Sequence, residues 1–138
     1  MATVIRAEIS EKNRYWIDKH RHYELKHFCL QYPSWKKAYV AYKDSLSSSK
    51  LDGLPSGNTL SDLTGKIATL KRYYSERIEL IERVAKETDE YLYPYILKAV
   101  TEELSYTYLK GVLNIPCGRD MYYNRYRKFF WLLSQERH

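Results

Sequence analysis

Glycine and proline are scarce in this chain of 138 residues, with five glycines and four prolines. Because both residues interrupt helices and form turns, their scarcity argues against a fold with many tight turns and favours long helices. Three of the glycines and one proline fall between Asp52 and Lys66, which concentrates the turn-forming residues in one place. The sequence therefore predicts an all-α fold: an N-terminal helical hairpin, a flexible loop, a long helix and a C-terminal helix-turn-helix.

Cysteine and long apolar runs are also rare. The two cysteines, Cys29 and Cys117, lie far apart and lack the spacing of a disulfide framework, so we expect reduced thiols in a cytosol. No stretch approaches the roughly 18 apolar residues that a membrane-spanning helix needs, and the N-terminus has no apolar core of signal-peptide length. These absences predict a soluble, intracellular protein with no membrane partner.

Acidic residues are few in the last quarter of the chain. The formal net charge is +6, and residues 105–138 contribute +4 of it, from six basic and two acidic residues. The hydrophobic fraction of 44% and the 15 tyrosines are enough to build a core, which excludes a disordered chain. A cation excess at one end of a folded chain favours an anionic partner, above all nucleic acid.

Apolar spacing predicts two helices before the glycine-rich stretch. The first is expected over residues 10–30, and its apolar face is expected to be Trp16, His20, Tyr23, His27 and Leu30. Pro33 ends it, because the residue before a proline is pushed out of helical geometry. The second helix has the apolar stripe Trp35, Ala38, Tyr39, Tyr42 and Leu46. We assign residues 1–47 to this helical pair and residues 48–60 to a flexible linker.

A long helix follows, from near Thr59 to about Lys86. Its apolar face is expected to be Leu63, Ile67, Leu70, Tyr74, Ile78, Ile81 and Val84. A further helix, capped by Thr88 or Asp89, is expected to end at Glu103, and these two helices make up residues 61–104. Ser105 is expected to cap the next helix, which opens the last segment, residues 105–138.

That last segment has the pattern of a helix-turn-helix. The first helix is expected to bury Leu109, Val112 and Leu113. Asn114 suits left-handed geometry, Ile115 is expected to fill the angle between the helices, and Pro116 prevents the first helix from continuing. The second helix is expected to turn inward a face formed by Tyr122, Tyr126, Phe129 and Leu133. The turn, NIPCG, is longer than the tightest examples of the motif.

The opposite side of this second helix is polar and basic. Arginine can bind guanine through two hydrogen bonds, asparagine can read adenine, and other basic groups suit phosphates. We expect five residues to bind DNA there: Arg119, Tyr123, Asn124, Arg127 and Lys128. A basic, solvated corner of an all-α protein that touches no nucleic acid would show the same pattern, so the pattern leaves both interpretations open.

Other constellations favour neither a metal site nor an enzyme. His20 and His27 are about two helical turns apart, too far to share one metal ion, and we expect half-buried core histidines. Cys117 beside Arg119 could have a lowered thiol pKa, but a structural thiol is the simpler interpretation. No phosphate loop or catalytic motif occurs, so we expect neither catalytic residues nor cofactors. Trp131 falls on the outer side of its helix, where an exposed tryptophan suggests an interface with the N-terminal helices or with a second subunit.

The layout resembles the RinA/ArpU-type phage late transcriptional regulators of Gram-positive bacteria. Three segments carry the resemblance: YPSW (32–35), LPSGNTLSDLTGKIA (54–68) and LKGVLNIPCGRDMYYNRYRKFFWLL (109–133). Lys110, where a small residue is usual, departs from the pattern. The resemblance implies a sigma-region-like helix-turn-helix in a regulator that activates late genes in the cytoplasm of a bacterial host cell.

Three hypotheses follow from the residues and the resemblance together. The first is a regulator that binds double-stranded DNA, with RNA polymerase as a further partner and a homodimer as its form. The second is a DNA-packaging protein similar to a phage terminase small subunit, which would form a ring. The third is an interaction module whose basic face meets an acidic protein.

Overall fold

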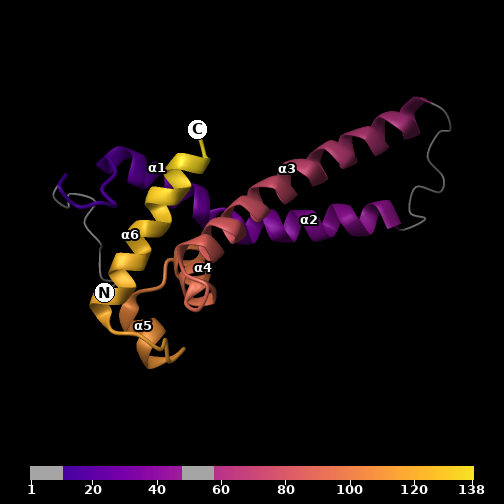
Figure 1. Cartoon of the computed structure of the whole chain (residues 1–138). Helices are drawn as coiled ribbons and strands as arrows, with labels where there is room; N and C mark the ends of the chain where they lie inside the picture. Colours follow the sequence, from indigo (N-terminus) through magenta and orange to yellow (C-terminus); the bar gives the residue numbers. More distant parts are fainter. Residues whose placement is uncertain (1–10, 48–57) are drawn as a thin grey trace. The chain divides into compact units, whose positions relative to one another are not determined.

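The computed structural model describes residues 11–47 and 58–138, and in these residues the only regular elements are six α-helices (Figure 1). The predicted all-α fold is confirmed. Most of the predicted linker lies outside the described residues. The helices are α1 (Lys19–Leu30), α2 (Tyr32–Ser47), α3 (Asn58–Thr88), α4 (Tyr93–Glu102), α5 (Tyr106–Gly111) and α6 (Arg119–Glu136).

Contacts divide the chain into two compact units. The first unit joins the residues before Tyr32 with Leu80–His138, and the second unit is Tyr32–Glu79. The helix α3 contributes residues to both. The predicted segments 1–47, 48–60, 61–104 and 105–138 follow the order of the chain, whereas these units group parts that are distant in sequence.

The start of α1 differs from the prediction of a helix over residues 10–30. Residues 11–18 are not helical, and α1 begins at Lys19. The carboxylate of Asp18 accepts a hydrogen bond from the backbone N–H of His20 at 2.9 Å, which is an N-cap. The side chain of Asn13 likewise accepts from the N–H of Tyr15 at 2.9 Å. These local bonds compete with helix formation, and the apolar spacing that predicted the longer helix gives no sign of them.

The predicted inner face of the first helix was also wrong. His20, Tyr23 and His27 are exposed, and Trp16 precedes the helix. The buried side chains are His22, Leu25, Phe28 and Cys29. Leucine and phenylalanine gain more from burial than histidine does, so they decide which side of the helix faces inward.

The second unit contains α2 and the first part of α3. The predicted break is confirmed, since α1 ends at Leu30 and α2 begins at Tyr32, with Pro33 in its first turn. Tyr42 of α2 stacks with Tyr74 of α3 at a ring separation of 6.1 Å, and the Lys71 ammonium lies 5.8 Å from the Tyr39 ring. The two helices of this unit are thus joined by aromatic and cation–π contacts.

The long helix α3 confirms its predicted apolar face over the described side chains. Its buried members are Ile67, Ile78, Ile81 and Val84, and its half-buried members are Leu63, Leu70 and Tyr74. At its C-terminal end the hydroxyl of Thr88 donates to the carbonyl of Val84 at 2.8 Å. Thr88 therefore belongs to the end of α3. The predicted alternative in which Thr88 caps the next helix is wrong.

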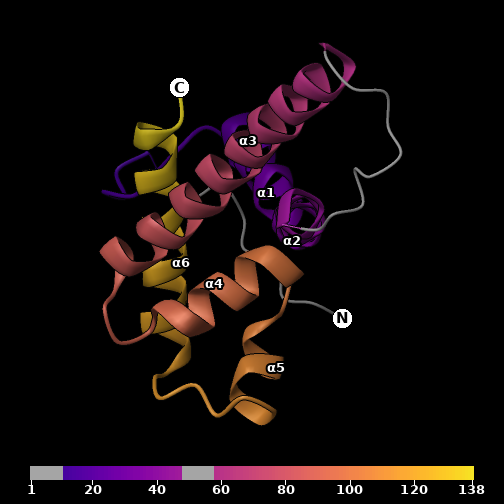
Figure 2. The same cartoon turned by 90° about the vertical axis from the view of Figure 1, so that its right-hand side faces the viewer.

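In the first unit, α6 packs against both α1 and α4 (Figure 2). The core contains eight valine, leucine, isoleucine or phenylalanine side chains with no exposed area: Leu25, Ile81, Val84, Ile96, Leu109, Ile115, Phe129 and Leu133. Burial of each such side chain contributes about 1.5–3 kcal/mol relative to exposure. This core fixes the position of α6 within the unit.

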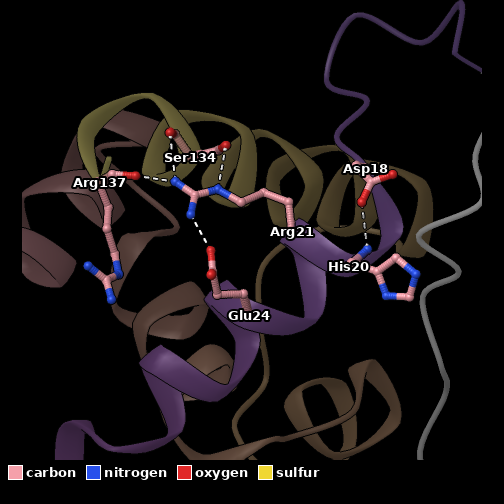
Figure 3. Close-up of polar contacts among 6 residues, drawn as sticks. All are labelled: Asp18, His20, Arg21, Glu24, Ser134 and Arg137. Carbon is pink, nitrogen blue, oxygen red and sulfur yellow. Dashed lines mark hydrogen bonds and ion pairs between the residues drawn. The ribbon is translucent and has the colours of Figure 1, made fainter.

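An arginine of α1 caps the C-terminal end of α6 (Figure 3). The last carbonyls of a helix lack partners within the helix. Arg21 donates to the backbone carbonyl and the hydroxyl of Ser134, at 3.1 Å each, and to the carbonyl of Arg137. Glu24 pairs with the same guanidinium. A residue of the first helix thus stabilises the end of the last one.

His22 is 7% exposed, and its ring lies 4.8 Å from that of Phe130. Burial, with a smaller effect of nearby Lys26, lowers the pKa of His22 to about 4. In the unfolded chain the pKa of His22 is near 6.5. Between pH 6.5 and pH 4, His22 is therefore protonated in the unfolded chain but neutral in the folded chain.

We expect the free energy of unfolding to fall by as much as ~3 kcal/mol between pH 6.5 and pH 4 because of His22. Urea unfolding at pH 4.5 and pH 7 measures this. His22→Gln should remove most of the loss, whereas the matched variant His27→Gln, at an exposed position, should keep it. Equal pH dependence in both variants would contradict the assignment.

Candidate nucleic-acid interface

The first helix of the predicted motif is short. The N–H of Tyr108 donates to the hydroxyl of Ser105 at 3.2 Å, which confirms the predicted cap, and α5 ends at Gly111. The helix α6 begins at Arg119, so residues 112–118 form the connection. This connection is longer than the roughly three or four residues typical of a helix-turn-helix.

The connection has the backbone geometry that the sequence predicted. Asn114 adopts the left-handed conformation, with φ of 55°. The next N–H, of Ile115, donates to the carbonyl of Leu109 at 3.0 Å, and the Ile115 side chain is fully buried. The Tyr106 hydroxyl donates to the carbonyl of Cys117 at 2.8 Å. Two anchors thus fix the turn to α5.

The prediction that Val112 faces inward is wrong. Val112 is 58% exposed, and Leu113 is half-buried. Because the helix ends at Gly111, helical spacing no longer governs the direction of Val112. Leu109 is buried as predicted.

The inner face of α6 agrees with the prediction. Tyr122, Phe129 and Leu133 are buried, and Phe130 joins them. The side chain of Tyr126 is half-buried, and its burial raises the pKa of its hydroxyl well above the usual value. This burial directs the remaining side of the helix towards solvent.

Arg119, at the first position of α6, is exposed and rests on aromatic rings. Its guanidinium lies 5.0 Å from the ring of Tyr106 and 5.9 Å from the ring of Tyr123, and it donates to the Tyr123 hydroxyl at 3.3 Å. No carboxylate within the described parts of the chain pairs with it. Two of the predicted residues, Arg119 and Tyr123, therefore form one unit.

Asn124 takes part in a chain of polar contacts. Arg125 donates to the side-chain oxygen of Asn124 at 2.5 Å and to the carboxylate of Asp89 at 2.8 Å. Asp89 also accepts from the N–H groups of Tyr91 and Leu92. Burial would raise the pKa of Asp89, but the hydrogen bond from Arg125 and these backbone bonds outweigh burial and lower it. Asp89 therefore caps a turn before α4 and neutralises Arg125.

Arg127 and Lys128 are half-buried and have no carboxylate partner among the residues that the structure describes. The Arg127 Nε atom is sealed from solvent without a hydrogen-bond partner. With Arg119, they give α6 three cationic groups whose charge the described chain leaves unpaired. The structure places all five predicted residues on the part of α6 between Arg119 and Lys128.

Three other predictions concern residues near this surface. Trp131 is half-buried, with the Tyr15 ring 5.4 Å away edge-on, so it packs against the N-terminal segment and is not an exposed tryptophan. Burial raises the pKa of the Cys117 thiol, in the opposite direction to an activated thiolate. His20 and His27 are exposed, whereas we expected them to be half-buried.

Metal-binding and membrane-spanning features are absent from the described part of the chain. No cluster of three or more His, Cys, Asp or Glu side chains in residues 11–47 and 58–138 could hold a metal ion. In the same residues, no helix is long and apolar enough to cross a membrane.

Comparison with known proteins gives no relative. No protein-family model, no curated protein and no solved structure matches the chain. The resemblance to phage late regulators therefore stays a prediction, and the functional argument rests on the geometry of α5, the turn and α6.

Substitution of Asn114 tests the geometry of the turn. A left-handed conformation costs a residue with a Cβ atom about 1 kcal/mol, less for asparagine and nothing for glycine. We expect Asn114→Ala to lower the free energy of unfolding by about 1 kcal/mol and Asn114→Gly to leave it unchanged or raise it slightly. Chemical unfolding of both variants checks the order. A more stable alanine variant would be incompatible with the turn described here.

Proposed function

We propose that the protein binds double-stranded DNA through α6 and acts as a transcriptional regulator. The observation that carries this proposal is the trio Arg119, Arg127 and Lys128 on α6, which has no carboxylate partner within the described chain. A cation that is already paired with a carboxylate gains little binding free energy from a phosphate, because it must first give up its partner. An unpaired cation can neutralise a phosphate directly and release the counterions condensed on the DNA. The packing of the inner face holds Lys128 on the outer side of the helix, and Arg119 is exposed at its first position.

The aromatic support of Arg119 favours a defined contact. A guanidinium that lies on two tyrosine rings loses less conformational freedom when it binds a phosphate or a base edge. The N-terminal end of α6 adds the partial positive charge of the helix dipole at the same place. Asp120 is the one acid in the first turn and weakens this field only locally.

The narrower role depends on the sequence resemblance. Activation of phage late genes is what the resemblance implies, and it is part of the proposal on that basis. RNA polymerase, as an acidic partner of the basic face, and a homodimeric form are further parts of the proposal. A dimer would place two α6 helices on two half-sites, which supplies the specificity that one short helix rarely reaches.

A salt titration with duplex DNA tests the proposal. Each phosphate contact contributes about 0.9 to the slope of log affinity against log salt concentration. We expect Lys128→Gln to reduce this slope by about one and to weaken binding to random and specific DNA alike. The matched control is Lys98→Gln, which removes a lysine of α4 that pairs with Glu102 at 3.3 Å and should leave the slope unchanged.

The result against the proposal is equally clear. Absence of binding by the wild-type protein at about 100 mM salt, where non-specific binders still hold DNA at roughly micromolar concentration, would exclude DNA as the ligand. An equal loss in the Lys128 and Lys98 variants would mean that net charge, and not α6, drives association.

Arg119→Lys separates charge from geometry. Lysine keeps the charge but lacks the planar group that stacks on Tyr106 and Tyr123. We expect this variant to keep the salt slope of the wild type while it loses several-fold in affinity for a specific site selected from random DNA. Unchanged affinity would show that the stacked position has no part in recognition.

A further inference from the structure

A small cleft with aromatic walls lies in the first unit. Its volume is about 70 Å³, and residues of α1, α4, α5 and α6 line it. The rings of Tyr106, Tyr122, Tyr126 and Phe130 form much of its lining. Successive rings are 4.9–6.1 Å apart, which is ordinary aromatic packing. None of the three cations of α6 lines the cleft, although Arg119 contacts two of its lining residues, Tyr106 and Tyr123.

Three polar groups that line the cleft have no hydrogen-bond partner among the described residues. They are the ring of His22 and the hydroxyls of Tyr122 and Tyr126. His22 is 7% exposed and Tyr122 is 1% exposed, so bulk solvent reaches them poorly. In the described chain, the sealed polar atoms without a partner are the Nε atoms of Arg127 and Arg137. The three groups are thus unpaired without being sealed, and the residues that carry them line the cleft.

The three unpaired polar groups, on His22, Tyr122 and Tyr126, are uncharged at neutral pH. Burial keeps His22 neutral, with a pKa of about 4, and raises the pKa of both tyrosine hydroxyls. The two charged side chains of the lining, Lys26 and Glu103, pair with each other at 3.1 Å. A charged ligand would therefore lose its hydration without gaining an opposite charge, which disfavours it.

The size of the cleft limits what it can hold. It is about half the roughly 150 Å³ of an engineered apolar cavity that encloses benzene. Because it opens to solvent, one edge of a ring can remain outside. Its volume exceeds what one or two water molecules require, and its unpaired groups could satisfy a polar substituent.

We infer that this cleft binds a small, uncharged, single-ring aromatic molecule that carries a hydroxyl or ring N–H group. The ring would lie among the aromatic side chains, and its polar group would bond to the hydroxyl of Tyr122 or Tyr126. This inference goes beyond the proposed DNA binding and does not rest on it.

Titration of the full chain with phenol, followed by two-dimensional NMR in the absence of DNA, tests the inference. We expect saturable shifts in the millimolar range, concentrated on the signals of His22, Tyr122 and Tyr126. Benzene, which lacks the hydroxyl, should bind at least several-fold more weakly, and benzoate should not bind. Benzene binding as tight as phenol, or phenol shifts that do not saturate, would overturn the inference.

Removal of one hydroxyl provides the matched variants. Tyr126→Phe keeps the ring and should weaken phenol binding several-fold, whereas Tyr91→Phe, at a tyrosine that is 80% exposed and outside the lining, should not. Tyr122→Phe repeats the test at the second buried hydroxyl. Unfolding curves confirm that each variant is folded. If both cleft variants bind phenol like the wild type, the hydroxyls do not form the site and the inference fails.

Discussion

Burial of one side of α6 is the constraint on which the first unit depends. Tyr122, Phe129 and Leu133 can leave water together only if this side of the helix meets α1 and α4. Because a helix is rigid, the same burial determines that Asn124 and Lys128 lie on the remaining side, while Arg119, in register with Tyr122, is exposed because it begins the helix. The core and the candidate interface are therefore two faces of one element, and a change in the packing of either neighbouring helix would redirect the other face.

The basic residues of the C-terminal segment divide into structural and available ones. Arg125 is committed to Asp89, and the guanidinium of Arg137 lies 4.1 Å from the ring of Phe28. Arg119, Arg127 and Lys128 are left without a carboxylate partner in the described chain. A count of charges along the sequence gives all of them equal weight, although two of the six basic residues in 105–138 are held in contacts within the fold.

Several features set by neighbouring residues were predictable, whereas features set by distant pairs were not. The left-handed Asn114, the cap at Ser105 and the inner face of α6 follow from local geometry and helical spacing, which the sequence displays directly. The pair formed by Asp89 and Arg125, 36 residues apart, has no local signal. Helix ends decided by local side-chain bonds also escaped prediction, since a cap at Asp18 and a continued helix share much of the same pattern.

The hydrogen bond between Arg125 and Asn124 limits how Asn124 could read a base. Recognition of adenine in the major groove requires the amide both to donate and to accept. The oxygen of Asn124 already accepts from Arg125, so the wholly free group is the amide nitrogen, a donor. In the proposed complex, the Asn124 amide would therefore act mainly as a donor, to the O6 or N7 of guanine, the O4 of thymine or the N7 of adenine, and the second bond that adenine recognition needs would be weakened. An internal contact of the protein would thus shift the base preference that the residue type alone suggests.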